Sequence, residues 1–314
     1  MSYLIKDNVS VARFFILSGL NETKDYREIL FTFTLLYYCV ILFANISVIT
    51  IIILDRNLHE PMYILLCSFF INGLYGTAGF YPKFLSDLLS SSQQISYEGC
   101  LSQAFVMYSF VCCDFSILAV MSYDTYVATC QPLHYLCIMT KKRLSQPICF
   151  SWVTPFCILS INVLLTSRLT LCGTNIARVL RVNWIIIKLA CSDADTFLNN
   201  VAAYFTIVVY VSHGLFTIWT YRHLIRTSVR AKGARKKFMQ TCVPHLVSLV
   251  TFTALIVCDL MYMRFGSLHL PQSLQNVIAI EFLLIPPIMN PLIYGYKLTK
   301  IRNRIVGLVY FKRK

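Results

Sequence analysis

The sequence predicts an all-α membrane protein, a seven-transmembrane helix bundle with a short amphipathic C-terminal helix. Its composition is too apolar for a soluble globule, with 57% hydrophobic and only 13% charged residues and a mean hydropathy of +0.64. Seven apolar segments also have the length that a helix needs to cross a bilayer core of about 30 Å. None shows the alternation of a barrel strand, so helices are expected to satisfy the backbone groups in lipid.

The seven segments divide the chain into three parts. They form one bundle over residues 29–296, after an N-terminal segment of residues 1–28 and before a tail of residues 297–314. The apolar run Val11 to Leu20 is interrupted by Arg13, so we expect no cleavable signal peptide. The expected spans are Ile29–Leu54, Met62–Pro82, Leu101–Tyr123, Pro147–Ser167, Phe197–Tyr221, Phe238–Met263 and Leu274–Tyr296.

Positive charge is distributed unevenly between the two ends of this bundle. With the N-terminus outside, 18 of the 28 lysines and arginines fall on the inner side, whereas eight acids fall outside and three inside. Such an inner excess of positive charge is the usual topology signal of membrane proteins. The formal net charge of +14 therefore indicates an extracellular N-terminus and a cytoplasmic tail, with no nucleic-acid partner. The sequons at Asn8 and Asn21 then lie outside, as predicted glycosylation sites.

Polar residues within the spans have structural explanations at this stage. We expect Asn45 in the first span to make a hydrogen bond between helices. Pro61 is placed to start the second helix. Asp114 is an acid in hydrocarbon, which is costly unless it faces the interior, where it is expected to be protonated or hydrogen-bonded. In the last span, Pro291 frees a carbonyl, and we expect Asn290 to satisfy it and to give a hinge.

Several strings carry a resemblance to one family. The string MSYDTYVATC from Met121 to Cys130 closely resembles the signature at the inner end of the third span of odorant receptors, a branch of the rhodopsin-like G-protein-coupled receptors. The strings HEPMY (59–63), KFMQTCVPHL (237–246) and NPLIY (290–294) extend the resemblance, and residues 72–83 look like the fish-type branch. The resemblance covers essentially the whole chain.

The resemblance implies an odorant receptor in the plasma membrane of olfactory sensory neuron cilia. Such a receptor binds a small odorant between its helices and activates a heterotrimeric G protein of the stimulatory olfactory type, with no cofactor and no enzymatic activity. The basic inner loop between Arg222 and Lys237 is expected to contact this G protein and anionic membrane lipid.

The resemblance also implies which residues line the odorant pocket. The matching ligand-binding residues are Met107, Tyr108, Val111, Cys112, Phe205, Thr206, Val209 and Tyr262. Asp259 lies three residues before Tyr262 and therefore on the same helical face. It is expected either to meet a cationic or hydrogen-bonding ligand or to pair with a neighbouring helix.

A second implied set couples the receptor to its G protein, and it contains one departure from the family. The set consists of Asp124, Thr125, Tyr126, Tyr221, Asn290, Pro291 and Tyr294. The family carries Arg where this chain has Thr125, and that Arg pairs with the adjacent acid at rest and contacts the G protein in the active state. The alternative to a signalling receptor is therefore a folded receptor that couples weakly or does not signal.

Two further sites follow from the resemblance. The family joins the top of the third span to the second outer loop and adds a bridge within that loop, but Arg181 stands where the first partner is expected. We therefore expect a Cys172–Cys191 disulfide with Cys100 left over, and a bridge from Cys100 to either cysteine is the alternative. Gly73 stands where most rhodopsin-like receptors carry a sodium-binding Asp. The resemblance implies that Asp114 partly replaces this acid as a sodium ligand, and the alternative is a protonated or hydrogen-bonded acid that holds helices together.

Other classes are less consistent with the sequence. A light-driven pump needs a Lys in the last span for retinal, and Leu274–Tyr296 contains none. A transporter or channel would show paired repeats or matched broken helices, and the sequence shows neither. Enzymatic signatures such as H-E-x-x-H and G-x-S-x-G are missing.

Overall fold

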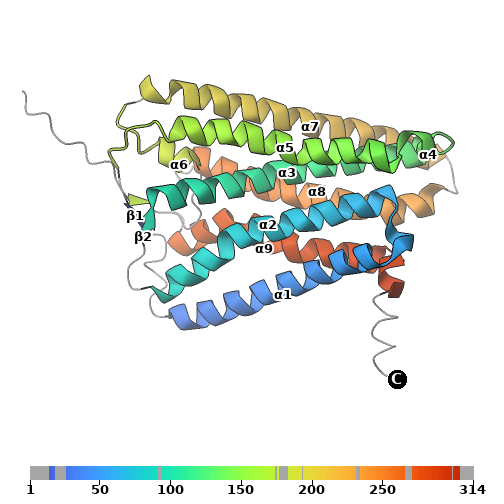
Figure 1. The fold of residues 1–314 in the computed structure, drawn as a ribbon, viewed down its shortest axis with the longest axis horizontal. Helices are drawn as coiled ribbons and strands as arrows, with labels where there is room; N and C mark the ends of the chain where they lie inside the picture. The colour runs from blue at the N-terminus through green and yellow to red at the C-terminus, as the bar shows by residue number, and fades with distance from the viewer. Residues whose placement is uncertain are drawn as a thin grey trace, which may run out of the picture.

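The computed structural model describes residues 14–17, 26–90, 94–173, 175–176, 183–192, 194–230, 234–265, 271–298 and 300–304. Within these ranges, seven helices are long and apolar enough to cross a membrane, and they run side by side as one bundle (Figure 1). They are α1 (Arg27–Leu54), α2 (Pro61–Leu89), α3 (Tyr97–Cys130), α5 (Lys141–Thr166), α7 (Phe197–Arg230), α8 (Ala234–Phe265) and α9 (Gln272–Lys297). The predicted fold class is confirmed, and the chain is a multi-pass membrane protein.

Local chemistry sets the starts of several helices. Pro61 occupies the first turn of α2, where its missing N–H costs nothing. Ser96 caps α3 by accepting a hydrogen bond from the Gly99 amide at 3.1 Å, and Thr140 caps α5 in the same way. The α2 helix continues beyond the predicted end at Pro82 to Leu89, because the prediction followed only the apolar part of each helix.

Short elements close both ends of the bundle. At the end that the charge distribution predicts to be the outer one, and that is called outer below, β1 (Phe14–Leu17) pairs antiparallel with β2 (Gln94–Ser96) and parallel with β3 (Asn175–Ile176). This small sheet lies beside α6 (Asn183–Ile187) at the end opposite the C-terminus (Figure 1). The remaining short elements are η3 (Ala194–Thr196), η2 (Arg56–Leu58) and α4 (Tyr135–Ile138). The sequence predicted neither the sheet nor its register.

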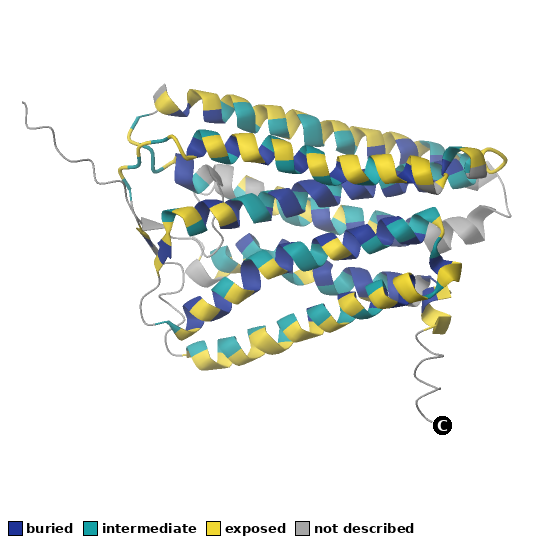
Figure 2. Cartoon of the chain, in the orientation of Figure 1, coloured by how far each residue is buried: buried dark blue, intermediate teal, exposed yellow. Residues whose placement is uncertain are grey.

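Burial identifies α3 as the central helix. Most of α3 is buried, whereas α1 and α7 carry long exposed stretches (Figure 2). The exposed residues on these two outer helices are largely apolar, as with Phe43 and Val208. An apolar exterior is expected where a helix faces lipid, because hydrocarbon does not penalise it. The predicted glycosylation sites Asn8 and Asn21 lie outside the described residues.

Candidate functional site

The predicted pocket residues of α3 lie where three helices meet. Met107 is buried in a cluster that contains Phe252 of α8 and Phe282 of α9, and Tyr108 and Val111 are partly buried against the same cluster. The outer halves of α3, α8 and α9 therefore form one apolar wall at the predicted depth of the pocket.

Cys112 and an unpredicted tyrosine continue this region towards α7. Cys112 is buried, and the Tyr210 hydroxyl lies beside its thiol and the hydroxyl of Ser116. Tyr210 Oη is buried and makes no well-formed hydrogen bond within the described part of the chain. A buried donor of this kind suits a ligand with an acceptor group. The signal in the sequence was a phenol within an apolar span, next to the predicted Val209.

The three predicted pocket residues of α7 differ in their burial. Thr206 Oγ1 accepts a hydrogen bond from Asn162 Nδ2 of α5 at 3.1 Å, and Val209 is partly buried. Phe205 is 59% exposed, so the structure does not bring most of its ring together with the buried residues.

Two carboxyl groups lie near one another at the outer ends of α8 and α9. Asp259 is buried, and Tyr262 on the same helix is partly buried. Glu281 of α9 lies within electrostatic reach of Asp259. Its Oε1 is buried and has no hydrogen-bond partner among the described residues. The sequence analysis singled out Asp259 and did not include Glu281.

A small cavity with a few polar groups lies beside Asp114 in the middle of the bundle. Asn72 Nδ2 donates a hydrogen bond to Asp114 Oδ1 at 2.7 Å, which ties α2 to α3. The cavity has a volume of about 10 Å³ and is lined by Asn45, Gly73 and Asn290 as well as Asp114. The Asn290 Oδ1 atom is buried and lacks a partner within the described ranges. The cavity has room for a single water-sized species. Its polar lining, a carboxylate and amide oxygens, suits a water or a small hard cation.

The structure corrects the expected partner of the freed carbonyl in α9. Pro291 cannot donate to the Pro287 carbonyl, and Asn45 Nδ2 of α1 donates to that oxygen at 2.8 Å. The prediction that Asn290 satisfies this carbonyl was wrong, because the side chain of Asn45 reaches it from across the helix interface. The expected helix-to-helix hydrogen bond of Asn45 is confirmed by the same contact.

At the inner end of α3, Asp124 has a partner other than arginine. Tyr135, the first residue of α4, donates its hydroxyl to Asp124 Oδ1 at 2.9 Å. Thr125 is buried and donates Oγ1 to the Met121 carbonyl of its own helix at 2.8 Å. Burial, followed by the neighbouring Asp124 carboxylate, raises the pKa of Tyr135. Its hydroxyl is therefore a neutral donor at physiological pH.

The remaining coupling residues form two contacts between inner helix ends. Tyr294 Oη of α9 lies 3.0 Å from Nδ1 of His245 on α8, within hydrogen-bond distance. Tyr221 of α7 is buried in a cluster with Cys242 of α8, and Tyr126 of α3 packs against it. The contact of His245 with Tyr294 was not predicted from the sequence.

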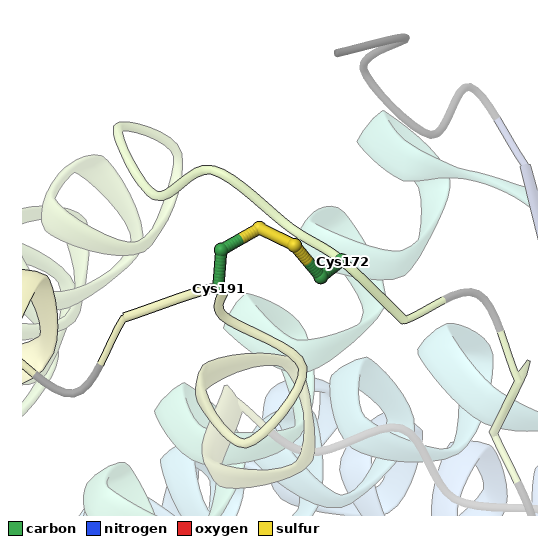
Figure 3. The surroundings of a disulfide bond; sticks show 2 residues. All are labelled: Cys172 and Cys191. Atoms are coloured by element: carbon green, nitrogen blue, oxygen red, sulfur yellow. A yellow bond between two sulfur atoms is a disulfide. The ribbon is translucent and has the colours of Figure 1, made fainter. Parts of the chain in front are cut away.

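A disulfide organises the outer loop that precedes α7. It joins Cys172 to Cys191, the pair that the family resemblance implied (Figure 3). The Cys172 amide donates to the Leu189 carbonyl and the Cys191 amide to the Thr170 carbonyl, both at 2.9 Å. Cys100 is not part of this bond and lies buried at the top of α3.

The bundle and the arrangement at its inner end define a receptor of the seven-helix class. A family model described as "Olfactory receptor" matches residues 33–312. The chain is 32% identical over 311 residues to Olfactory receptor 1D2 of Pan troglodytes, with 98% of each chain covered. It is 34% identical over 295 residues to Olfactory receptor 6B2 of Homo sapiens, with 92% of each covered. The chain belongs to the olfactory receptor family of G-protein-coupled receptors and is not an enzyme.

Proposed function

We propose that this protein binds a small odorant in the outer half of the bundle and activates a G protein of the stimulatory olfactory type. The family match over residues 33–312 carries this proposal. The N-terminus lies outside the cell, and the receptor works in the plasma membrane of olfactory cilia, as a member of the fish-type branch. The charge asymmetry of the loops supports the orientation, and the string at residues 72–83 supports the branch.

The ligand contacts residues of α3, α7 and α8. The apolar wall around Met107 supplies most of the contact area, and Tyr210 Oη supplies a hydrogen-bond donor from α7. Asp259 and Tyr262 contact a cationic or hydrogen-bonding group of the ligand, with Glu281 near enough to strengthen the attraction. Few polar groups in an apolar lining are typical of small-molecule sites. The complete predicted set is Met107, Tyr108, Val111, Cys112, Phe205, Thr206, Val209, Asp259 and Tyr262.

Activation changes the inner ends of the helices. Asp124, held by Tyr135, and the contact of Tyr294 with His245 lie at the face where a G protein docks. A ligand shifts the equilibrium only through its different affinity for the two states. The cavity at Asp114 holds a sodium ion in one of these states, with Asn45 and Asn290 as neighbouring oxygen donors. When bound, the ion adds positive charge that stabilises the carboxylate.

The test is a cAMP assay in cells that express the full chain together with a stimulatory olfactory α subunit. The panel contains small amines, neutral alcohols and carboxylates, and the variants are Asp259→Asn, Tyr210→Phe and, as a control on the same helix, Cys258→Ser. We expect at least one amine to raise cAMP, and Asp259→Asn to weaken its potency about tenfold, as the loss of a partly buried charge contact implies.

Three results would contradict parts of this function separately. Responses that persist with an inhibitory α subunit in place of the stimulatory one would contradict the type of G protein. Equal amine potency in the parent chain and in Asp259→Asn would remove Asp259 from the pocket. An N-terminal epitope tag that is stained only after permeabilisation would contradict the orientation.

A further inference from the structure

A second, larger groove lies outside the predicted odorant pocket, in the inner half of the bundle. It has a volume of about 420 Å³ and is lined by residues of α3, α5, α7 and the short helix α4. Phe150 of α5 and Phe216 of α7 line it and are themselves 64% and 41% exposed. The groove therefore opens sideways, on the lipid-facing surface of the bundle. The small side chains of Ser116 and Ala119 on α3 leave the space. This volume is within the range of small-molecule sites.

The three serine hydroxyls along the groove are bonded within their own helices. Ser116 Oγ donates to the Cys112 carbonyl at 3.0 Å, and Ser151 Oγ donates to the Pro147 carbonyl at 2.7 Å. Ser212 Oγ on α7 donates to the Val209 carbonyl in the same way. Since these serine protons are used, the walls offer mainly apolar surface, which suits a hydrocarbon chain.

Charge is concentrated at one end of the groove. Arg143 lies in the first turn of α5, at the inner end, and its side chain is exposed. One guanidinium nitrogen donates to the Cys137 carbonyl at 3.0 Å, which leaves further N–H groups for an anion. The described residues that line the groove include no carboxylate. An apolar slot with a cation at its inner mouth is complementary to an anionic amphiphile.

We propose that this groove binds an anionic phospholipid of the inner leaflet. One acyl chain lies between Val120, Phe150 and Phe216, and the headgroup phosphate lies on Arg143. The inner leaflet is the negatively charged leaflet, and arginine binds phosphate through several N–H groups. The lipid also reaches the coupling end, because Met139 lines the groove four residues after Tyr135, which donates to Asp124. Bound lipid therefore stabilises the contact between α4 and α3.

The experiment measures lipid binding, so its result does not depend on the proposed signalling function. The full chain is reconstituted in phosphatidylcholine nanodiscs with a trace of phosphatidylserine that carries a photoreactive acyl chain, and the labelled peptides are mapped. We expect labelling in α3, α5 and α7 around the groove, and several-fold less labelling with a phosphatidylcholine probe of the same chain. This comparison uses the parent chain alone, so it needs no variant to fold.

Matched variants assign the two parts of the lipid. Arg143→Gln is expected to reduce phosphatidylserine labelling about fivefold, the usual value of one basic residue near an anionic surface. Arg143→Lys keeps the charge and should retain most of it. The neighbouring exposed cation gives the control Lys142→Gln, which should have little effect. Ser212→Phe fills the groove and should abolish labelling there, whereas Val211→Phe, on an exposed position of α7 that does not line the groove, should not.

Three results would overturn the proposal. The first is equal labelling of the groove by the phosphatidylserine and phosphatidylcholine probes. The second is full labelling of Arg143→Gln. The third is displacement of the probe by cholesterol but not by unlabelled phosphatidylserine, which would assign the groove to a sterol.

Discussion

Asp124 shows how one substitution redistributes the contacts of a buried acid. The resemblance implies an arginine where this chain has Thr125, whose hydroxyl donates to the Met121 carbonyl of its own helix. Asp124 remains buried and accepts a hydrogen bond from Tyr135 instead. A buried carboxylate needs a donor more than it needs a particular residue type. The inner end of α3 is therefore tied to α4 through Tyr135.

Placing an arginine at position 125 should strengthen coupling to the G protein. In Thr125→Arg, the guanidinium pairs with Asp124 at rest and contacts the G protein in the active state. If the second contact is the stronger, as we expect, the odorant concentration for half-maximal cAMP falls about fivefold, as for a coupling free energy of about 1 kcal/mol. Thr125→Val is the control, because it removes the hydroxyl without adding charge. Identical concentration curves for Thr125→Arg and the parent chain, at equal surface expression, would show that the threonine does not limit coupling.

Removing the Tyr135 hydroxyl should weaken coupling to the G protein. Tyr135→Phe deletes a hydrogen bond to a carboxylate, worth about 1.5–3 kcal/mol, and frees α4 from α3. Since burial and Asp124 raise the pKa of Tyr135, the hydroxyl donates throughout the physiological range, and the defect should be the same at pH 6.5 and pH 8. We expect the potency in the cAMP assay to fall about tenfold. The matched control is Tyr204→Phe, on an exposed tyrosine of α7; an equal loss there would argue for a general effect on folding.

The candidate site was only partly predictable, and the missing parts have a common cause. Asp124 and Tyr294 were identified because they belong to contiguous strings, but their partners Tyr135 and His245 lie 11 and 49 residues away. Helical periodicity relates residues three or four apart and does not connect different helices. Tyr210 was missed for the same reason, because its place beside Cys112 depends on how α7 packs against α3.

Helix packing in this bundle depends on small residues at one interface. A Cβ atom at Gly76 of α2 would overlap the ring of Phe110 on α3, and one at Gly79 would overlap Val106. Small residues are common where membrane helices approach closely. The close contact of α2 and α3 also brings Asn72 within reach of Asp114. The two glycines therefore allow α2 and α3 to pack closely, and this close packing helps to form the cavity beside Asp114.

Gly76→Ala should destabilise the protein although alanine is the better helix former. The propensity gain is about 1 kcal/mol, whereas overpacking against Phe110 costs about 1–3 kcal/mol, and Phe110 is buried with little room to move. Gly214→Ala on α7 is the control, because a Cβ there meets nothing within 4 Å and only the gain remains. Thermal unfolding in detergent should give a lower midpoint for Gly76→Ala and an unchanged or higher one for Gly214→Ala. The opposite order would mean that the interface relaxes freely.

The elements themselves were largely predictable because hydrocarbon imposes a length and a polarity on each span. The helix ends were less predictable. The α3 helix continues beyond its predicted end at Tyr123 to Cys130, because a helix does not stop where its apolar residues stop. The outer sheet was not predictable at all. Its strands have four, three and two residues, and Phe14–Leu17 lies inside an apolar run that carries no alternation long enough to indicate a strand.

Across the outer end, this sheet connects segments that are far apart in the sequence. The central strand β1 pairs with β2 before α3 and with β3 in the loop before α7. Phe15 is fully buried in a cluster that contains Ile95, Cys100 and Ile186. The resemblance implies an anchoring cysteine where this chain has Arg181, and the cluster around Phe15 joins residues next to α3 with residues of this loop. The Cys172–Cys191 bond holds the loop together internally but does not attach it to α3.

Phe15→Ala should therefore loosen the outer end of the receptor while leaving the bundle folded. Deleting a buried phenylalanine ring costs about 3–5 kcal/mol, and here the cost falls on one small cluster. Hydrogen-exchange mass spectrometry should show faster exchange in residues 94–96 and 183–187, with the inner halves of α2 and α3 unchanged. The adjacent Phe14 is 56% exposed on the same strand, so Phe14→Ala is a matched control that should change little. If both variants exchanged like the parent chain, the loop would be held by contacts other than Phe15, and the missing cysteine would have no substitute in β1.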